Sequence, residues 1–230
     1  MNETDQWKQQ AAEAALAYVN SGMVLGLGTG STTDFALQKL SRLLKEGRLK
    51  NITGIPSSHK TLKRAKELGI PTGELNEYPV IDLTIDGADE IDPGLNLIKG
   101  GGGALLREKI LAQASKQLII VADEHKLSQR LGSGFALPVE VLPVAWHPER
   151  LFIEKLKAEV KLRRREDGEL FHTDNGNYIL DCRFKKIESP FELAEILQAR
   201  AGVMAHGLFL QIASRVIIGG SGGLQELERK

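Results

Sequence analysis

The sequence predicts an α/β fold: an open, mostly parallel sheet with helices on both faces, joined to a smaller α+β subdomain. Two observations predict it. Between residues 1 and 132, short apolar segments alternate with amphipathic ones, which is typical of parallel strands covered by helices on both faces. After about Gly132 the order changes to a strand, a helix, two strands and a helix, which indicates a small α+β unit.

The large domain begins with an amphipathic helix expected over residues 5–20, where apolar side chains recur at helical spacing until Gly22 breaks the pattern. Ser31 or Thr32 can cap the next helix, which Gly47 ends. The elements that follow are expected as a strand at 23–27, a helix at 33–46, a strand at 51–55, a helix at 60–68, a strand at 80–85, a helix at 104–115 and a strand at 117–122.

The second part of the chain is expected to form a ferredoxin-like α+β subdomain over residues 133–206, while 1–132 and 207–230 form the large domain. Two strands near the C-terminus, at 208–212 and 215–218, are expected, and at least one should return to the large sheet. The subdomain's own elements are expected as a strand at 138–142, a helix at 148–159, a hairpin at 160–177 turning at Asp167 and Gly168, a strand at 178–184 and a helix at 190–200.

Composition indicates an ordinary globular protein. The 230 residues are 42% hydrophobic and 26% charged, and 30 Lys and Arg balance 30 Asp and Glu. With no net charge, neither a nucleic acid nor a membrane is expected as partner. The basic run at 163–165 is followed directly by Glu166 and Asp167, so it is interpreted as a solvated hairpin of mixed charge rather than a nucleic-acid contact.

Cysteine content and apolar segments also indicate the cellular compartment. Cys182 is the single cysteine, so no internal disulfide can form, and its place in an alternating segment favours an inert strand cysteine. The N-terminal residues lack the basic and apolar regions of a secretory signal peptide. No apolar run approaches the ~18 residues of a membrane span. We therefore expect a cytoplasmic protein.

Three motifs follow strands or lead into helices at the edge where parallel sheets bind ligands. The first is the glycine-rich segment Gly26–Thr33, which offers backbone amides, hydroxyls and a helix N-terminus to an anion. Ser31 stands where a dinucleotide fingerprint has its third glycine, and no Gly-Lys-Ser/Thr of a Walker loop is present. A monophosphate site is the sharper interpretation, and a plain strand-to-helix turn is the alternative.

The second motif holds four carboxylates within seven residues, Asp86, Asp89, Glu90 and Asp92. The order of ligands in a calcium loop is missing, so no metal site is expected. A pair of acids that hold sugar hydroxyls and a solvated acidic turn both remain open, and the segment alone favours the turn.

The third motif is Lys99 followed by four glycines and a segment that carries Glu108. Ordering each glycine costs roughly 0.5–1 kcal/mol relative to alanine, so such a run favours backbone that touches a ligand or takes a positive φ. Glu108 lies one helical turn past Ala104 and can point back toward the strand ends as a general base. The alternative is an ordinary first-turn glutamate paired with Lys109 or Arg107.

Other candidates are weaker. Ser58 and His59 show no nucleophile elbow, and the five histidines lack metal-ligand spacing. In the segment after the strand at 117–122, Lys126 is the preferred functional residue, as a counter-charge for phosphate.

In these residues and motifs, the chain resembles the type A ribose-5-phosphate isomerases. The resemblance rests on the order of several separate segments over nearly the whole chain, namely Gly28–Thr33, Asp86–Glu90, Lys99–Gly102, Arg107–Lys109, Val121–Asp123, Leu137–Val141 and Thr173–Asn177. Gly103 and Leu106 depart mildly from the family pattern, beside the proposed base and without replacing a reactive group.

The resemblance implies interconversion of ribose 5-phosphate and ribulose 5-phosphate without metal or organic cofactor, in a homodimer or homotetramer. It implies that Glu108 moves a proton between C1 and C2 through an enediolate and that Asp86 assists ring opening. Asp89 and Lys99 would hold hydroxyls and the developing oxyanion. The implied substrate contacts are Thr29, Gly30, Ser31, Thr32, Gly87, Ala88, Gly100, Gly101, Gly102, Lys126 and, less directly, Lys8.

The two alternatives are another sugar-phosphate enzyme of the same fold and a protein from a different functional class. An amino-sugar phosphate isomerase-deaminase would ordinarily use a histidine near the acidic segment, and none lies between His59 and His125. A non-catalytic sugar-phosphate sensor would need no base, whereas Glu108, Asp86 and Lys99 are all present. Both alternatives are therefore less favoured than the isomerase.

Overall fold

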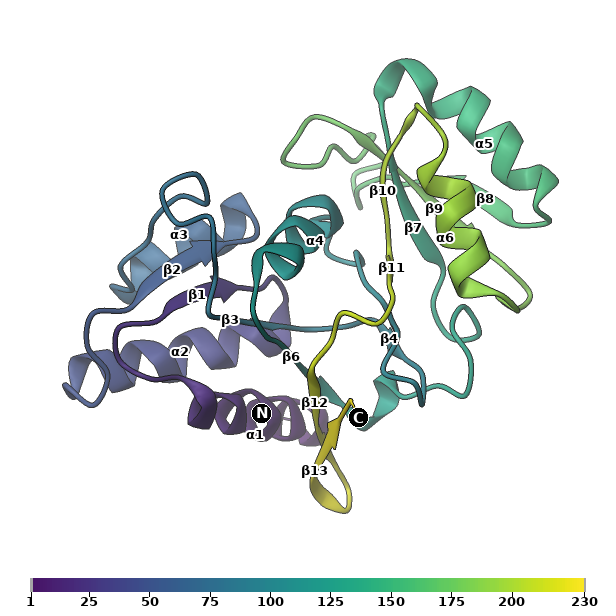
Figure 1. Ribbon diagram of the computed structural model, residues 1–230. Helices are drawn as coiled ribbons and strands as arrows, with labels where there is room; N and C mark the ends of the chain where they lie inside the picture. Colours follow the sequence, from purple (N-terminus) through teal and green to yellow (C-terminus); the bar gives the residue numbers. More distant parts are fainter. Residues whose placement is uncertain (1, 230) are drawn as a thin grey trace. The chain divides into compact units, whose positions relative to one another are not determined.

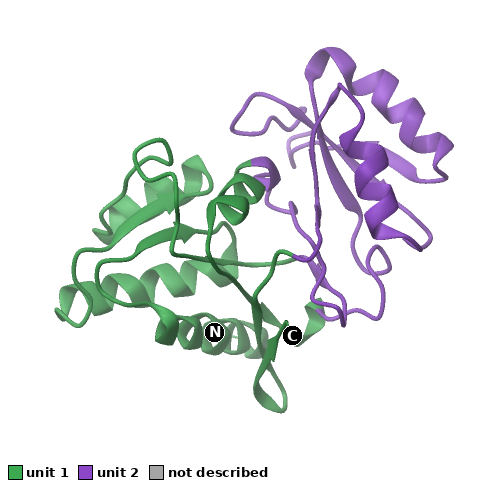
Figure 2. Cartoon of the chain, in the orientation of Figure 1, with its two compact units in different colours: residues 1–88, 107–126, 212–230 green, residues 89–106, 127–211 purple. Residues whose placement is uncertain are grey.

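The computed structural model describes residues 2–229, which form two compact units (Figures 1 and 2). Unit 1 holds the chain up to Ala88, Arg107–Lys126 and the segment from Ile212 onward, and unit 2 holds Asp89–Leu106 and Leu127–Gln211. Each unit is a group of residues that pack against one another, and a packed unit is not necessarily an independent domain. The division into 1–132 with 207–230 and 133–206 therefore stays a proposal.

Unit 1 is built on a six-stranded sheet with the order β13-β12-β6-β3-β1-β2. Five strands are parallel, and β13 pairs antiparallel with β12 at the edge. This confirms the predicted mostly parallel sheet. The strands are β1 Val24–Leu27, β2 Thr53–Pro56, β3 Leu83–Asp86, β6 Leu118–Asp123, β12 Arg215–Gly220 and β13 Gly223–Glu228.

Helices cover both faces of this sheet (Figure 1). Because side chains alternate along a strand, Leu25 and Leu27 of β1 pack on one face with α1 and α2, while Val24 packs on the other face with Leu111 of α4. The helices are α1 Glu3–Ala15, α2 Ser31–Lys45, α3 His59–Leu68 and α4 Leu105–Ala114. Short 3-10 helices follow α1 and β6, at Leu16–Tyr18 and Glu124–Lys126.

The chain changes direction in the sheet between β1 and β3. From β1 it moves to β2 on one side, and β3, β6 and β12 then follow on the other. At such a switch point the loops beyond the carboxyl ends of the strands leave a crevice where ligands bind. The loop after β1 and the end of β3 are therefore the expected ligand position in unit 1.

Unit 2 contains a β-α-β-β-α-β arrangement, which confirms the predicted ferredoxin-like subdomain. Its four antiparallel strands have the order β10-β7-β9-β8, and Val139, Leu180 and Ile153 lie in the core between sheet and helices. The elements are β7 Leu137–Val141, α5 Trp146–Lys155, β8 Glu159–Leu162, β9 Tyr178–Arg183, α6 Pro190–Gln198 and β10 Val203–His206, with a 3-10 turn at Pro143–Ala145.

Some predicted boundaries were wrong. The helix expected to reach residue 159 ends at Lys155, because Lys157 takes a φ of 68° and Glu159 begins β8. β10 was not predicted from the sequence, and the strand expected at 208–212 is only β11, Leu208–Phe209. That strand joins β4, Glu90–Ile91, and β5, Leu97–Ile98, in a three-stranded sheet of unit 2, whereas β12 returns to the large sheet as expected.

Among residues 2–229, no helix combines the length and the apolar character that crossing a membrane requires. Cys182 is buried in β9, as expected for an inert strand cysteine, and burial raises the pKa of its thiol.

Candidate active site

The glycine-rich loop after β1 leads into a helix start that no side chain caps. Gly30, with a φ of 134°, is the N-cap of α2, and no capping side chain is found there among the described residues. In contrast, Asn2 caps α1 and Ser58 caps α3 through side-chain oxygens. The expectation that Ser31 or Thr32 caps α2 was wrong, because the helix already begins at Ser31. The first-turn amides of α2 can therefore serve an anion.

Thr29 lies in a network of hydroxyl groups. Its Oγ1 lies 2.8 Å from Oγ of Ser57, 2.8 Å from Oγ of Ser58 and 2.9 Å from Oγ1 of Thr61. Thr61 in turn donates to the carbonyl of Gly28 at 3.1 Å. The network ties the loop to the start of α3, so Thr29 shapes the loop whether or not it also contacts a ligand. Sequence analysis had not linked these hydroxyls to the loop.

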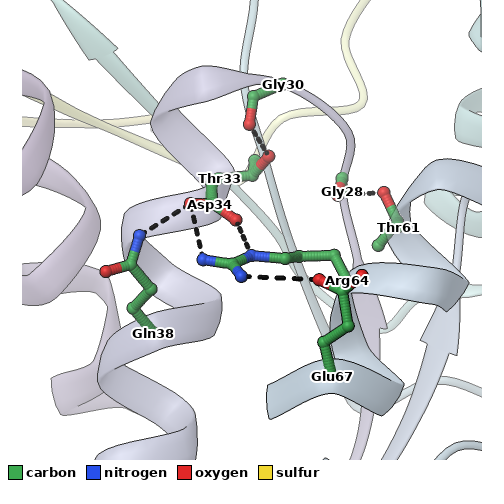
Figure 3. Close-up of polar contacts among 8 residues, drawn as sticks. All are labelled: Gly28, Gly30, Thr33, Asp34, Gln38, Thr61, Arg64 and Glu67. Carbon is green, nitrogen blue, oxygen red and sulfur yellow. Dashed lines mark hydrogen bonds and ion pairs between the residues drawn. The ribbon is translucent and has the colours of Figure 1, made fainter.

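A cavity of about 660 Å³ opens beside the same loop within unit 1. Gly28, Gly30 and Ser31 line it together with the basic residues Lys60, Lys63 and Arg64 of α3. Figure 3 shows how Arg64 reaches across to Asp34 of α2, with Nε 2.6 Å from Oδ1. Three carboxylates, those of Asp5, Asp34 and Glu67, line the cavity as well, so its positive and negative charges balance.

Asp34 offsets part of that positive charge. Burial raises the pKa of its carboxyl, but hydrogen bonds from Arg64 and Gln38 and the nearby positive charges outweigh burial, so the pKa lies below its ordinary value. The Arg64–Asp34 pair therefore joins α2 to α3 as an ion pair at neutral pH.

Asp86 ends β3 at the switch point and is 1% exposed. Its Oδ1 accepts hydrogen bonds from the backbone N–H groups of Thr29, at 3.2 Å, and Gly87, at 2.8 Å. A Cβ added to Gly28 would lie 2.3 Å from the same oxygen. The glycine at 28 is thus required by the close approach of the Asp86 carboxylate, which joins the first and second motifs in one site.

The other acidic residues of the second motif lie in unit 2 and have separate partners. Asp89 accepts the N–H of Gly101 at 2.7 Å, and Asp92 closes a turn by accepting from Asn96. Glu90 is 2% exposed and accepts the N–H groups of Gly132 and Gly134. Glu90 and Asp92 are therefore structural residues, and the interpretation of the whole segment as a solvated turn was wrong.

Burial raises the pKa of the Glu90 carboxyl, but the hydrogen bonds it accepts outweigh burial and hold the pKa below its ordinary value. Glu90 is thus a buried carboxylate anchored to the loop at 132–134.

The third motif is a constrained turn in unit 2. Lys99 is 3% exposed, its N–H donates to the carbonyl of Gly207 at 2.9 Å, and its Nζ lies 5.5 Å from the centroid of the Phe209 ring. Gly100 and Gly103 take φ values of 105° and 82°. These positive φ values confirm the predicted reason for the glycine run.

Glu108 lies in α4, the helix that follows the glycine run, and is 4% exposed. The expected alternative, a first-turn glutamate paired with Lys109 or Arg107, stays open, because burial alone does not decide between the two interpretations. A buried carboxylate remains a candidate general base.

Lys8 and Lys126 lie on neighbouring segments of unit 1. The rings of Trp7 and His125, the residues next to them in sequence, have centroids 5.5 Å apart. Both lysines are partly buried, and Lys8 has only a distant ion pair with Asp5, at 4.0 Å. The ring contact brings the segment of Lys8 next to the segment of Lys126, which is the proposed counter-charge for phosphate.

One residue with an important role was missed. Arg163 was interpreted as part of a solvated hairpin, but its side chain is only 13% exposed and donates to the carbonyls of Gly100 and Gly101. Arg164 and Arg165 are exposed, as expected. The sequence offered no indication of this, because alternation along β8 places Arg163 on the same face as the exposed Glu159 and Lys161.

A doubly wound sheet with an anion loop and a buried carboxylate at its switch point defines a class, the α/β enzymes that act on phosphorylated small molecules. Within that class the particular family follows from comparison with known proteins. Residues 53–223 match the family model of ribose 5-phosphate isomerase A (phosphoriboisomerase A). The chain belongs to this family.

Individual relatives agree. The chain is 53% identical over 228 residues to a ribose-5-phosphate isomerase A of Desulfatibacillum aliphaticivorans, covering 99% of both chains. A solved D-ribose-5-phosphate isomerase in complex with phospho-erythronic acid has a TM-score of 0.97 at 39% identity, covering 100% of both chains. The ribose 5-phosphate isomerase of Plasmodium falciparum has a TM-score of 0.95 at 41% identity, covering 98% of this chain and 99% of that one.

Proposed function

We propose that this chain is an aldose–ketose isomerase that interconverts D-ribose 5-phosphate and D-ribulose 5-phosphate through an enediolate, in the non-oxidative pentose phosphate pathway. The observation that carries the proposal is membership of the ribose 5-phosphate isomerase A family over more than half of the chain. The buried carboxylates of Asp86 and Glu108 support it, since proton transfer next to a carbonyl needs positioned acids and bases.

Glu108 is the proposed base. It takes the proton from C2 of the open-chain aldose and returns it to C1, while the electron pair passes to the carbonyl oxygen and forms the enediolate. Asp86, whose carboxylate is held by two backbone N–H groups, assists ring opening and proton movement on the sugar oxygens. Lys99 and Asp89 hold the hydroxyls, and the ammonium of Lys99 stabilises the negative oxygen.

The substrate's remaining contacts are proposed as follows. The loop of Thr29, Gly30, Ser31 and Thr32 and the ammonium groups of Lys126 and Lys8 hold the phosphate, supported by the uncapped first turn of α2. Gly87, Ala88 and the amides of Gly100, Gly101 and Gly102 contact the sugar. Each of these positions corresponds to the family pattern described from the sequence.

The proposed reaction needs no metal or organic cofactor, because enolisation requires only a base and a site for negative charge. A homodimer or homotetramer in the cytoplasm, without nucleic-acid or membrane partners, is the proposed setting. Light scattering coupled to size-exclusion chromatography tests the assembly, and turnover with excess chelator tests the independence from metal.

The experiment that tests the function measures ribulose 5-phosphate formed from ribose 5-phosphate, with deuterium incorporation from D₂O as a second readout. The Glu108→Gln variant removes the base and keeps the side chain's shape, so kcat is expected to fall about 10²–10⁴-fold. Affinity for phospho-erythronic acid should stay within about tenfold, because phosphate binding does not depend on the base. Glu154→Gln, at a partly exposed ion pair with Arg150 on α5, is the matched control.

Two outcomes would count against the proposal at different levels. A wild-type chain that forms no ribulose 5-phosphate would remove the function. Near-normal turnover by Glu108→Gln would remove Glu108 from its role and leave the function standing.

A further inference from the structure

Arg163 connects the ferredoxin-like sheet of unit 2 to the glycine segment. It follows β8, and its Nη1 donates to the carbonyl of Gly100 at 2.9 Å and to that of Gly101 at 3.1 Å. Its other donors, Nε and Nη2, form a two-point contact with the carboxylate of Asp181 on β9, at 2.9 Å for Nε. One guanidinium thus contacts a carboxylate and two peptide carbonyls at once.

These contacts fix two peptide groups of the glycine segment. The carbonyl of Gly100 shares a peptide plane with the N–H of Gly101, and the carbonyl of Gly101 shares one with the N–H of Gly102. No peptide bond among the described residues is cis, so each N–H points away from the carbonyl of its own plane. The N–H groups of Gly101 and Gly102 therefore point away from the guanidinium.

One of these N–H groups has a partner that supports the geometry. The N–H of Gly101 donates to Oδ2 of Asp89 at 2.7 Å, so it faces a residue proposed to bind the sugar hydroxyls. A carbonyl that accepts a charged hydrogen bond also polarises its peptide, which makes the N–H a stronger donor. Arg163 thus both directs and strengthens the donors of this turn.

The surroundings of Arg163 hold the guanidinium in place. Its Cζ lies 5.8 Å from the centroid of the Phe171 ring, and a Cβ added to Gly103 would lie 2.3 Å from that ring. The ring therefore packs against both the arginine and the end of the glycine segment. A lysine has no planar fork, so it cannot contact Asp181 at two points and both carbonyls together.

We propose that Arg163, oriented by Asp181, is a positioning residue for the glycine segment: it keeps the N–H of Gly101 on Asp89 and, through the carbonyl of Gly101, directs the N–H of Gly102 at the enediolate oxygen. This inference rests on the isomerase function proposed above. Arg163 itself touches no substrate atom, and it acts through the backbone it holds.

The central test is the variant Arg163→Lys, which keeps the charge and loses the fork. Removing an oxyanion donor costs about 10²–10³-fold in kcat, so displacing donors without removing them should cost roughly 10–100-fold. KM should change less than about threefold, because the phosphate contacts lie on other residues. Asp181→Asn keeps the shape and weakens the two-point contact, and a smaller loss of kcat is expected.

Arg164→Lys is the matched control. Arg164 also donates through Nη1 to a backbone carbonyl, that of Gly168 at 2.7 Å, but that carbonyl belongs to its own exposed hairpin. Its kcat should stay within twofold of the wild type. An equal loss in both variants would overturn the inference.

Ligand binding separates positioning from general loosening of the fold. Phospho-erythronic acid carries a carboxylate where the enediolate is negative, and erythritol 4-phosphate carries a neutral alcohol at the same carbon. In Arg163→Lys the acid should lose affinity in parallel with kcat, while affinity for the alcohol stays unchanged. Equal weakening of both ligands, or unchanged binding of the acid, would overturn the inference.

A final measurement does not depend on activity. Amide hydrogen exchange of the peptide covering residues 99–106 should become faster in Arg163→Lys and stay unchanged in Arg164→Lys. Unchanged exchange in Arg163→Lys would refute the inference even if the wild type proves inactive, whereas an inactive wild type with faster exchange would refute only the proposed function.

Discussion

The chain has two glycine-rich segments next to its functional candidates, and a side chain added to them would meet different parts of the protein. Cβ atoms added to Gly26, in β1, and to Gly28, just after it, would lie 1.8 Å from Oγ1 of Thr84 and 2.3 Å from Oδ1 of Asp86. Those residues stand on the neighbouring strand β3. In the turn at 100–103, Gly100 and Gly103 take positive φ values of 105° and 82°.

The difference teaches how each turn is kept ordered. Backbone pairing and the carboxylate of Asp86 hold the first turn through groups within unit 1. The second turn depends on side chains from a hairpin about sixty residues further along the chain, Arg163 and Phe171. A substitution should therefore act through the packing of β1 against β3 at the first turn, and through the side chains of Arg163 and Phe171 at the second.

The largest expected effect is at the first turn. In Gly28→Ala the new Cβ would lie 2.7 Å from the Cα of Asp86, a backbone atom that cannot move without distorting the pairing of β1 with β3. We expect a loss of about 3 kcal/mol in the free energy of unfolding and a loss of kcat larger than tenfold. Denaturant unfolding and the isomerase assay measure both. If Gly28→Ala were as stable as the wild type, the close approach of Asp86 would not be what requires glycine at this position.

A substitution in the second turn should lower the free energy of unfolding by less, for two separable reasons. In Gly103→Ala the positive φ costs about 1–3 kcal/mol, and contact with the Phe171 ring adds to it. Gly176→Ala is the control, because its φ is 78° and a Cβ there would meet nothing within 4 Å.

Gly103→Ala should lower the free energy of unfolding more than Gly176→Ala, and the difference between them measures the contact with the Phe171 ring. Adding Phe171→Leu to Gly103→Ala should recover part of this difference. If Gly103→Ala and Gly176→Ala are equally unstable, tertiary contact does not hold the second turn.

A smaller effect is expected for binding beside the first turn. Lys126→Ala should raise KM about tenfold and change kcat less than threefold, since a phosphate contact acts equally on the ground and transition states. Steady-state kinetics over a wide range of ribose 5-phosphate concentrations measure the split. A large fall in kcat at constant KM would assign Lys126 to the chemical step instead.

The last expected effect concerns the helix after the second turn. Burial lowers the pKa of Lys109 from 10.5 to about 7, so between these values the unfolded chain binds more protons than the folded chain. The contribution of Lys109 to the free energy of unfolding therefore rises with pH through this window, and below about pH 7 its burial costs most.

Lys109→Met should accordingly be more stable than the wild type at pH 6, with a smaller advantage at pH 9. Denaturant unfolding at the two pH values tests the sign. A difference that does not change with pH would contradict the lowered pKa.

Much of the candidate site could be read from the sequence because its residues cluster in short segments. Asp86, Asp89, Lys99 and Glu108 stand within a few residues of glycines or of a predicted strand end. The different hydrogen-bond partners of Asp89, Glu90 and Asp92 could not be predicted in this way. These three carboxylates lie within four consecutive residues, yet each has a different partner that depends on the fold, namely Gly101, Gly132 and Asn96.

The start of α2 shows a similar limit. Both hydroxyl residues there are good N-caps by type, yet Gly30 occupies the cap because the turn after β1 needs its φ of 134°. Propensity describes what a residue can do at a helix end, and the path of the preceding loop decides where that end lies.

The order of apolar and polar residues by itself determined the α/β class, the ferredoxin-like subdomain and the three motifs, because periodicity and glycine placement act over a few residues. Only the tertiary structure decided that Arg163 serves the glycine turn while Arg164 and Arg165 face solvent. The reason is physical. The role of an arginine depends on the groups that its guanidinium contacts, and these come from segments that are adjacent in space and distant along the chain.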